Sequence, residues 1–424
     1  MEGQGGRRRR LVLVPYPFQG HITPMLQLGT ILHSKGFSIT IALSQFDFPD
    51  TSNHPDFVFL PLSNDSLYRF NDPDDIDRLE ELPCIIFDSL MYSAEAVALH
   101  LKLPSIIFRT GCATFALSFY VCPKIQKEGY TPFRASKSLE LVPEFHPLRF
   151  KDLPVFKLKN VDEFLQHVTT ITNLRTSGMI WNSIDCLEQS SLVQLCPKLQ
   201  VPIFLIGPMH KLAPAPSSSL LEEDRSCISW LNKQTEKSVL YVSFGSMATM
   251  EEKEVAEMAW GLANSKQPFL WVLRPGSVRM SESVDLLLDD FKESVGERGC
   301  IVKWAPQKEV LAHSSVGGFW SHCGWNSTLE SVSEGVPMIC RPFSGDQKII
   351  SRYVSHVWRV GIELENVIER GEIERAIKLL MVEKEGEEIR QRAADAKLEL
   401  QLSVQKGGSS YNSLNELVEF IVSV

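Results

Sequence analysis

The sequence predicts an α/β protein built from two doubly wound domains that face each other across a cleft. Three observations lead to this fold class. A chain of 424 residues is too long for one ordinary core, so two domains of about 200 residues are expected. Short apolar runs alternate with helical segments in both halves, which is typical of parallel βαβ units. A stretch rich in Pro, Ala and Ser, from Pro208 to Asp224, separates the halves.

The first half, residues 1–207, is expected to form one parallel sheet with helices on both faces. A helix is predicted over Pro24–Ser34, between the first two strands. The predicted strands are Leu11–Val14, Ser38–Leu43, Phe57–Leu62, Cys84–Phe87, Ser105–Phe108, Met179–Asn182 and Ile203–Ile206.

After a linker over residues 208–224, the same rhythm predicts a second domain over residues 225–406. A helix is expected at Glu251–Ser265, and residues 369–405 are charged and helical. The predicted strands are Val239–Phe244, Phe269–Leu273, Ile301–Lys303, Gly318–Trp320 and Met338–Cys340. A break at Gly407–Ser410 precedes an amphipathic helix, so residues 407–424 are expected to return to the N-terminal domain.

Composition excludes several classes of protein. The net charge of −9 and pI near 5.7 argue against nucleic acid as a partner, because binding phosphates requires a basic face. Nine cysteines without CxxC spacing indicate reduced thiols and a cytoplasmic location. The apolar run after Arg7–Arg10 is too short for a signal peptide, and no run approaches the roughly 20 residues of a membrane span. We expect a monomer.

The segment from Trp304 to Gln347 contains the residues needed to hold a nucleotide. Trp304 follows a predicted strand, where its indole can stack on a base or pack in the core. Asn326 and Ser327 open a helix, so they either cap it or lie where backbone N–H groups face an anion. His322 precedes that turn, and Glu330 lies one turn further along.

A second cluster of polar residues lies at two strand ends of the first half. His21, in Phe18–His21, follows the first strand and precedes a helix expected to begin near Thr23; Gly20 permits a tight turn there. A His at this place can act as general base or simply pack at the turn. Asp88 ends the strand CIIFD, where it can orient the imidazole or cap the segment that follows. The absence of GxGxxG argues against NAD.

One alternative to this base mechanism is a metal site. The acidic stretch Asn71–Asp77 has the DxD spacing with which some transferases hold a divalent cation on a diphosphate. Because the stretch contains Pro73 and is polar throughout, a solvated loop is the favoured interpretation, and no metal is predicted.

The chain resembles the plant secondary-product UDP-glycosyltransferases. The match includes Trp304-Ala305-Pro306-Gln307, the HCGWNS run from His322 to Ser327, Glu330, Gly335-Val336-Pro337 and Asp346-Gln347. The resemblance implies a GT-B fold of two Rossmann-like domains, inversion at the transferred sugar and UDP-glucose as co-substrate, with no other cofactor and no metal. The acceptor group would be a hydroxyl, carboxyl or amine of a small hydrophobic plant metabolite.

The resemblance also implies a role for each matching residue. Trp304 and Ala305 would bind uracil, Gln307 and Glu330 the ribose, and Trp325, Asp346 and Gln347 the sugar. The diphosphate would lie against Ser246, His322, Gly324, Asn326 and Ser327. His21 would be the base and Asp88 its partner, and Gly20 and Thr110 would line the acceptor site.

The chain departs from the family pattern around residues 61–83. Only 24 residues extend from Leu60 to Pro83, enough for one crossover but on the order of 30 fewer than the family pattern. This part of the family fold flanks the acceptor pocket. An alternative function is therefore a UDP-sugar or small-molecule binding protein with impaired catalysis.

Overall fold

The computed structural model describes residues 9–44, 49–62, 84–127, 138–143, 145–153, 175–213, 220–279, 291–365 and 368–424. The chain forms two compact units. The first contains Met1–Glu128, Lys157–Leu220 and Leu402–Val424, and the second contains Gly129–Phe156 and Leu221–Gln401. The segment Gly129–Phe156 thus groups with the second unit, although the sequence-based division places it in the first domain.

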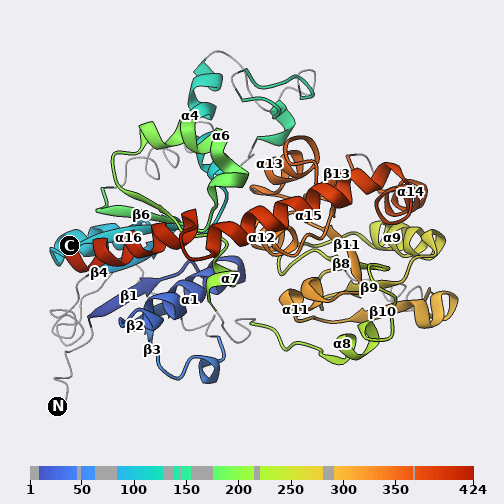
Figure 1. Cartoon of the computed structure of the whole chain (residues 1–424), viewed down its shortest axis with the longest axis horizontal. Coiled ribbons are helices and arrows are strands. Elements are labelled where there is room, and N and C mark those ends of the chain that lie inside the picture. The colour runs from blue at the N-terminus through green and yellow to red at the C-terminus, as the bar shows by residue number, and fades with distance from the viewer. Residues whose placement is uncertain are drawn as a thin grey trace. The chain divides into compact units, whose positions relative to one another are not determined.

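In the described part of the first unit, seven parallel strands form one sheet in the order β3-β2-β1-β4-β5-β6-β7 (Figure 1). The strands are β1 (Arg10–Val14), β2 (Ser38–Ser44), β3 (Val58–Leu62), β4 (Cys84–Asp88), β5 (Ser105–Arg109), β6 (Gly178–Trp181) and β7 (Ile203–Leu205). The strand order reverses at β1. From β1 the chain adds β2 and β3 on one side of that strand, and then adds β4 to β7 on its other side. Ligands of such sheets bind at the carboxyl ends of the strands beside this switch point.

Helix α1 (Gln19–Ser34) begins earlier than the sequence predicts. Gly20 and His21 therefore lie in its first turn, rather than in a loop before it. Pro24 is tolerated inside the helix because its ring removes only one backbone hydrogen bond close to the helix start. The other helices of this unit are α3 (Ser93–His100), α4 (Ala113–Lys127), α6 (Asp185–Leu195), α7 (Met209–Leu212) and α16 (Ser409–Ser423).

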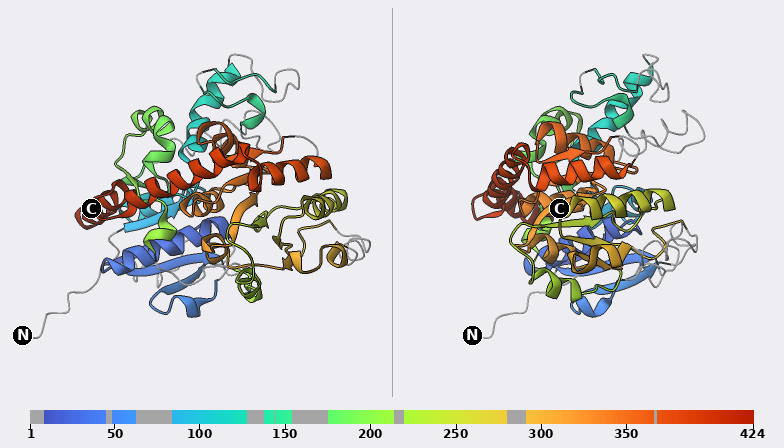
Figure 2. Two further views of the ribbon diagram at one scale, coloured as in Figure 1. Left: turned by 45° about the vertical axis from the view of Figure 1, so that its right-hand side comes forward. Right: turned by 90° about the vertical axis from the view of Figure 1, so that its right-hand side faces the viewer.

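The last helix of the chain completes the core of the first unit. Leu414, Leu417 and Ile421 of α16 are buried in one cluster with residues of β1, α1 and β2. The ring of Phe420 contacts Phe204 of β7, with 5.2 Å between ring centroids. Figure 2 shows α16 in dark red, ending at the marked C-terminus, beside the strands of this sheet. Helix α16 is therefore part of the core of the first unit.

The second unit contains a six-stranded parallel sheet among its described residues, in the order β10-β9-β8-β11-β12-β13. The strands are β8 (Val239–Ser243), β9 (Phe269–Val272), β10 (Gly299–Val302), β11 (Val316–Ser321), β12 (Met338–Cys340) and β13 (Gly361–Glu363). The short edge strand β13 is not predicted by the sequence. The switch point of this sheet lies between β8 and β11.

Helices cover this second sheet, and its core is separate from that of the first. Val255, Met258 and Leu262 of α9 pack with Ile373 and Ile377 of α14 in one buried cluster. The helices are α8 (Ser226–Leu231), α9 (Glu252–Ser265), α11 (Gln307–Ala312), α12 (Trp325–Ser333), α13 (Gln347–Arg352), α14 (Arg370–Met381) and α15 (Glu385–Val404), the last of which ends in the first unit.

Two sequence expectations concern the whole chain. Eight cysteines in the described part are free thiols, as the sequence predicts for them. In the same part of the chain, no helix combines the length and apolarity needed to cross a membrane.

Candidate active site

His21 and Asp88 lie together at the switch point of the first sheet. Asp88 is the last residue of β4, the strand beside β1, and His21 lies in the helix that follows β1. The His21 Nδ1 atom is 2.8 Å from Asp88 Oδ2. The Asp88 side chain is fully buried, whereas a quarter of the His21 side chain is exposed. The topology therefore brings together two residues that are 67 positions apart in the sequence.

The contacts of Asp88 define how the imidazole is held. Its Oδ1 accepts a hydrogen bond from the backbone N–H of Leu90 at 2.9 Å, which leaves Oδ2 directed at the ring. A carboxylate can only accept, so Nδ1 carries the proton in this pair. Nε2 is then the ring nitrogen that can take up a proton from another group.

Thr110 lies beside the His21 ring. Its Oγ1 lies 3.0 Å from His21 Nδ1, and the residue is buried after the end of β5. The hydroxyl therefore contacts the same ring nitrogen as Asp88 and helps to fix the ring plane. Gly20 lies beside His21 in the first turn of α1.

The turn after β5 is fixed by a residue that sequence reasoning missed. Buried Glu188 accepts hydrogen bonds from the backbone N–H groups of Ala113 (2.8 Å) and Thr114 (3.0 Å), at the start of α4. Burial raises the pKa of Glu188, and these hydrogen bonds oppose the rise. No sequence signal marks Glu188, because α6 follows α4 by about 60 residues and the pairing exists only in the fold.

At the switch point of the second sheet, His322 is enclosed by glycine backbone. It follows β11, and Gly245 and Ser246 form the turn after the neighbouring strand β8. A Cβ added to Gly245 would lie 2.8 Å from the His322 ring, and one added to Gly324 would lie 2.5 Å from it. Burial lowers the pKa of His322 to about 4, although the backbone of Ser243 favours the charged form. The imidazole is therefore neutral near pH 7.

Helix α12 begins directly after this histidine. Its N-cap is Gly324, which has no side chain that could cap the helix. The first N–H groups of the helix belong to Trp325, Asn326 and Ser327, three residues that the sequence assigns to ligand binding. The start of a helix carries N–H donors and a positive dipole end, which together favour a bound anion.

Gln307, Ser327 and Glu330 form a hydrogen-bonded group beside α12. The Gln307 Nε2 atom donates to Ser327 Oγ at 2.9 Å and to Glu330 Oε2 at 2.7 Å. The hydroxyl of buried Tyr241, on β8, donates to Gln307 Oε1 at 3.3 Å. Burial raises the pKa of Glu330, and the hydrogen bond from Gln307 opposes this rise. The arrangement presents a carboxylate and an amide that can bind two neighbouring hydroxyl groups. The sequence does not indicate this role for Tyr241, because its neighbours predict only an ordinary buried strand.

Gln347 is oriented by the loop that precedes it. Its Oε1 accepts hydrogen bonds from the backbone N–H groups of Phe343 (2.8 Å) and Ser344 (3.0 Å). The amide nitrogen of the same side chain therefore faces away from these two N–H groups. Asp346 is the N-cap residue of α13, so both predicted sugar-binding residues lie at the start of one short helix.

The two tryptophans of the segment differ in burial. Trp304, after β10, is partly exposed, and its backbone carbonyl accepts from the N–H of Asp224 at 2.9 Å. Trp325 is 3% exposed and packs against Trp358. Its indole is therefore largely buried, and its backbone N–H lies at the start of α12. Ala305 is also buried.

The metal alternative is not tested by the described residues. The acidic stretch Asn71–Asp77 lies outside them, as does most of the shortened segment 61–83 and part of the linker 208–224. Within the ranges described above, no group of three or more His, Cys, Asp or Glu side chains is arranged to hold a metal ion.

Comparisons with known proteins assign this chain to a class of sugar-transferring enzymes. A sequence model of the UDP-glucuronosyl and UDP-glucosyl transferase family matches residues 80–389. The chain is 49% identical to flavonol 3-O-glucosyltransferase UGT76E12 of Arabidopsis thaliana, covering 98% of this chain and 97% of that protein. It is 47% identical to UDP-glycosyltransferase 76E1 of Solanum lycopersicum, covering 98% and 93%. The chain belongs to this family and is a plant UDP-glycosyltransferase.

Solved structures show the same fold. Phytolacca americana UGT2, in complex with UDP-2-fluoroglucose and pterostilbene, superposes with a TM-score of 0.82 at 26% identity, covering 98% of this chain and all of that one. An anthocyanidin 3-O-glucosyltransferase in complex with UDP gives 0.81 at 28% identity, covering 99% and 100%. The protein therefore has the two-domain GT-B fold that the sequence predicts.

The alignment also bears on the length of the chain. The match to the Arabidopsis enzyme extends over 445 positions, more than the 424 residues present here. Some positions of that relative therefore have no counterpart in this protein.

Proposed function

We propose that the protein transfers glucose from UDP-glucose to a hydroxyl group of a small phenolic acceptor, with inversion at the anomeric carbon. The observation that carries this proposal is the His21–Asp88 pair, held at 2.8 Å at a strand switch point with part of the ring exposed. The Arabidopsis relative named as a flavonol 3-O-glucosyltransferase supports a flavonol as the first acceptor to test.

In the proposed reaction, the acceptor oxygen attacks the anomeric carbon of glucose while its proton passes to Nε2 of His21. The new C–O bond forms as the bond from that carbon to the β-phosphate oxygen breaks, and UDP leaves. Asp88 stabilises the imidazolium that results. His21 therefore acts as the base, and Asp88 sets the tautomer of its ring.

The donor is proposed to bind along α12. The first N–H groups of α12 and neutral His322 would bind the diphosphate, and Ser246 lies in the turn beside them. Gln307 and Glu330 would bind the ribose hydroxyls, Trp304 and Ala305 the uracil, and Asp346 and Gln347 the glucose. Stabilisation of the departing diphosphate by the helix start is the electrostatic contribution to the rate.

The test is transfer of labelled glucose from UDP-glucose to a flavonol, with the product resolved by chromatography and its anomeric configuration read by NMR. We expect a β-glucoside from the wild type. His21→Ala and Asp88→Asn should lower kcat by roughly 10²–10⁴-fold while UDP affinity stays unchanged. His33→Ala, a change in the last turn of the same helix α1, is the matched control and should keep full activity.

Two results would contradict the proposal. Undiminished transfer by His21→Ala would remove the base mechanism. UDP-glucose binding with no transfer to any acceptor would favour the alternative, a sugar-nucleotide binding protein with impaired catalysis.

We also propose that the transfer reaction requires no metal ion. Because a helix start and a histidine are available for the diphosphate, we expect the same rate with and without EDTA. A rate that falls with EDTA and returns with Mg²⁺ or Mn²⁺ would assign a role to the acidic stretch Asn71–Asp77. The cytoplasmic location also remains a proposal, based on the cysteine pattern.

A further inference from the structure

Residues 138–153, here called the strap, belong to the second unit although their neighbours in sequence belong to the first. The strap follows α4 and precedes β6, both of which are in the first unit. Its side chains Phe145, Leu148 and Phe150 are buried, and its short 3₁₀ helix, Phe150–Asp152, packs against α13. The strap is therefore an integral part of the second unit.

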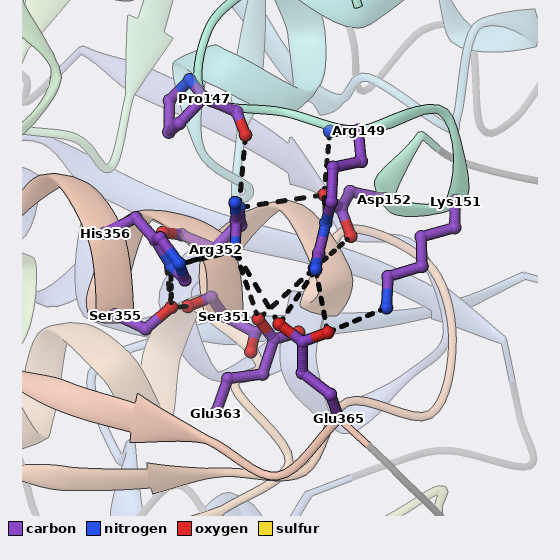
Figure 3. Close-up of polar contacts among 10 residues, drawn as sticks. All are labelled: Pro147, Arg149, Lys151, Asp152, Ser351, Arg352, Ser355, His356, Glu363 and Glu365. Carbon is purple, nitrogen blue, oxygen red and sulfur yellow. Dashed lines mark hydrogen bonds and ion pairs between the residues drawn. The ribbon is translucent and has the colours of Figure 1, made fainter. Parts of the chain in front are cut away.

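Arg149 is the centre of a buried ionic group, shown in Figure 3. Its Nη1 donates to both carboxylate oxygens of Glu365 at 2.8 Å. Its Nε and Nη2 donate to the two oxygens of Asp152 at 2.9 and 3.0 Å, and Nη2 lies 3.4 Å from Glu363. Such paired contacts match the fork of a guanidinium, which a lysine cannot reproduce.

The acidic partners lie at the carboxyl edge of the second sheet. Glu363 is the last residue of β13, opposite Cys340 at the end of β12. The loop that leaves β12 at this edge leads through Phe343 and Ser344 to Asp346 and Gln347. The ionic group and the predicted sugar-binding residues therefore belong to neighbouring strand ends.

Arg352 connects the strap to the helix that carries Gln347. It is the last residue of α13, and its Nε donates to the backbone carbonyl of Pro147 in the strap at 3.1 Å. Its Nη1 lies 3.7 Å from Glu365 and 4.0 Å from Glu363. The same two carboxylates therefore bind Arg149 from the strap and Arg352 from α13 (Figure 3).

The charges in this group balance. Arg149, Lys151 and Arg352 face Asp152, Glu363 and Glu365, and burial together with Arg352 lowers the pKa of neighbouring His356, so its ring stays neutral. Burial opposes ionisation of Glu365, but hydrogen bonds from Arg149 and Lys151 outweigh it and lower its pKa to about 2. A buried network of this kind contributes specificity of geometry more than stability.

We infer that Arg149 is a positioning residue for the sugar-binding end of the donor site. The strap and the acidic pair hold the C-terminal end of α13, while the loop N–H groups of Phe343 and Ser344 hold Gln347 at its start. A six-residue helix fixed at its far end keeps Gln347 and Asp346 in place for the glucose. This inference rests on the proposed function of that site.

The test compares the binding of UDP with that of UDP-glucose by calorimetry, without acceptor. In Arg149→Met we expect the affinity for UDP-glucose to fall about tenfold, whereas that for UDP changes by less than about twofold. The reason is that, in the proposed donor site, Asp346 and Gln347 at the start of α13 bind the glucose, whereas other residues bind the base, ribose and phosphates. Arg149→Lys should recover only part of the loss.

Glu365→Gln provides a second variant if Arg149→Met fails to fold, because its side chain is one-third exposed. It should weaken UDP-glucose binding about threefold and leave UDP binding unchanged. The matched control is Arg370→Met, which removes an arginine of the same unit whose ion pair with Glu257 lies outside this ionic group. It should bind both ligands as the wild type does.

The outcomes separate the two proposals. Equal loss of UDP and UDP-glucose affinity in the Arg149 and Glu365 variants, or no loss of either, would overturn the positioning role. A wild type that binds neither ligand would instead overturn the proposed function itself.

Discussion

His322 is the residue whose environment most constrains the proposed donor site. Its ring is enclosed by the backbone of Gly245 and Gly324, and burial holds its pKa near 4. A neutral imidazole has a single N–H, so it can donate one hydrogen bond.

The lowered pKa of His322 predicts a specific dependence of stability on pH. The unfolded chain binds this proton with a pKa near 6.5 and the folded chain only near 4, so acid favours the unfolded state. The free energy of unfolding should fall by at most about 3 kcal/mol between pH 6.5 and 4, less to the extent that the ring is solvated. Urea unfolding at several pH values measures it.

The control for this prediction is His322→Gln, which has no titrating group at the position. The difference in unfolding free energy between wild type and variant should shrink as the pH falls from 6.5 to 4, because only the wild type loses stability there. A constant difference would show that His322 does not titrate abnormally.

Single residues were predictable where a motif sits at a strand end. Asp88 and His322 lie at such ends, and His21 and Gln307 lie in the first turns of the helices that follow β1 and β10; parallel sheets place these ends together. Arg149 could not be found this way, because its partner Glu365 is 216 positions away and either residue alone looks like solvated charge. Tyr241 was equally hidden, since only the fold shows that its hydroxyl reaches Gln307.

At the scale of elements, the start of α12 is the most sensitive part of the proposed donor site. Gly324→Ala would place a methyl group 2.5 Å from His322 Nε2, while its φ of −63° is one that alanine adopts freely. The ring must move into the space before the helix start, so we expect UDP affinity to fall by about 5- to 100-fold, consistent with the cost of overpacking. Calorimetric titration with UDP measures this.

Gly371→Ala is the matched control. Gly371 also lies near a helix start, in α14, but a Cβ there would meet nothing within 4 Å. It should bind UDP normally and unfold at the same or a higher denaturant concentration. Wild-type affinity in Gly324→Ala would mean that the ligand does not approach α12.

Elements with a clear apolar pattern were predicted closely, whatever their length. Helix α9 and strands β1, β4 and β8 lie within about one residue of the ranges that periodicity indicates. The three-residue strand β13 has too few side chains for an alternating pattern, and its pairing with β12 depends on tertiary contacts. The early start of α1 was missed because Gly20 indicates a tight turn and Pro24 indicates the first turn of a helix.

At the scale of the whole molecule, the two separate cores predict that a ligand stabilises one unit selectively. UDP at 100 times its Kd should raise the free energy of unfolding of the unit that binds it by about 2.7 kcal/mol. Amide hydrogen exchange should therefore slow in β8, β11 and α12, and remain unchanged in β1, β4 and α16. Equal protection of all six elements would show that the two units unfold as one.

The division of the chain was predictable only in outline. The Pro- and Ser-rich stretch marks the change between units near Leu220, as its composition suggests. The assignment of the strap to the second unit has no compositional signal, because it results from buried contacts of Phe145, Leu148 and Arg149.

The return of α16 to the first unit has a consequence for synthesis on the ribosome. The rest of that unit has been translated by Leu220, but Leu414, Leu417 and Ile421 emerge only after the whole second unit. At about 5–20 residues per second, the apolar surface that they cover waits on the order of 10–40 s for its last helix. During that interval the nascent first unit is a natural client for chaperones.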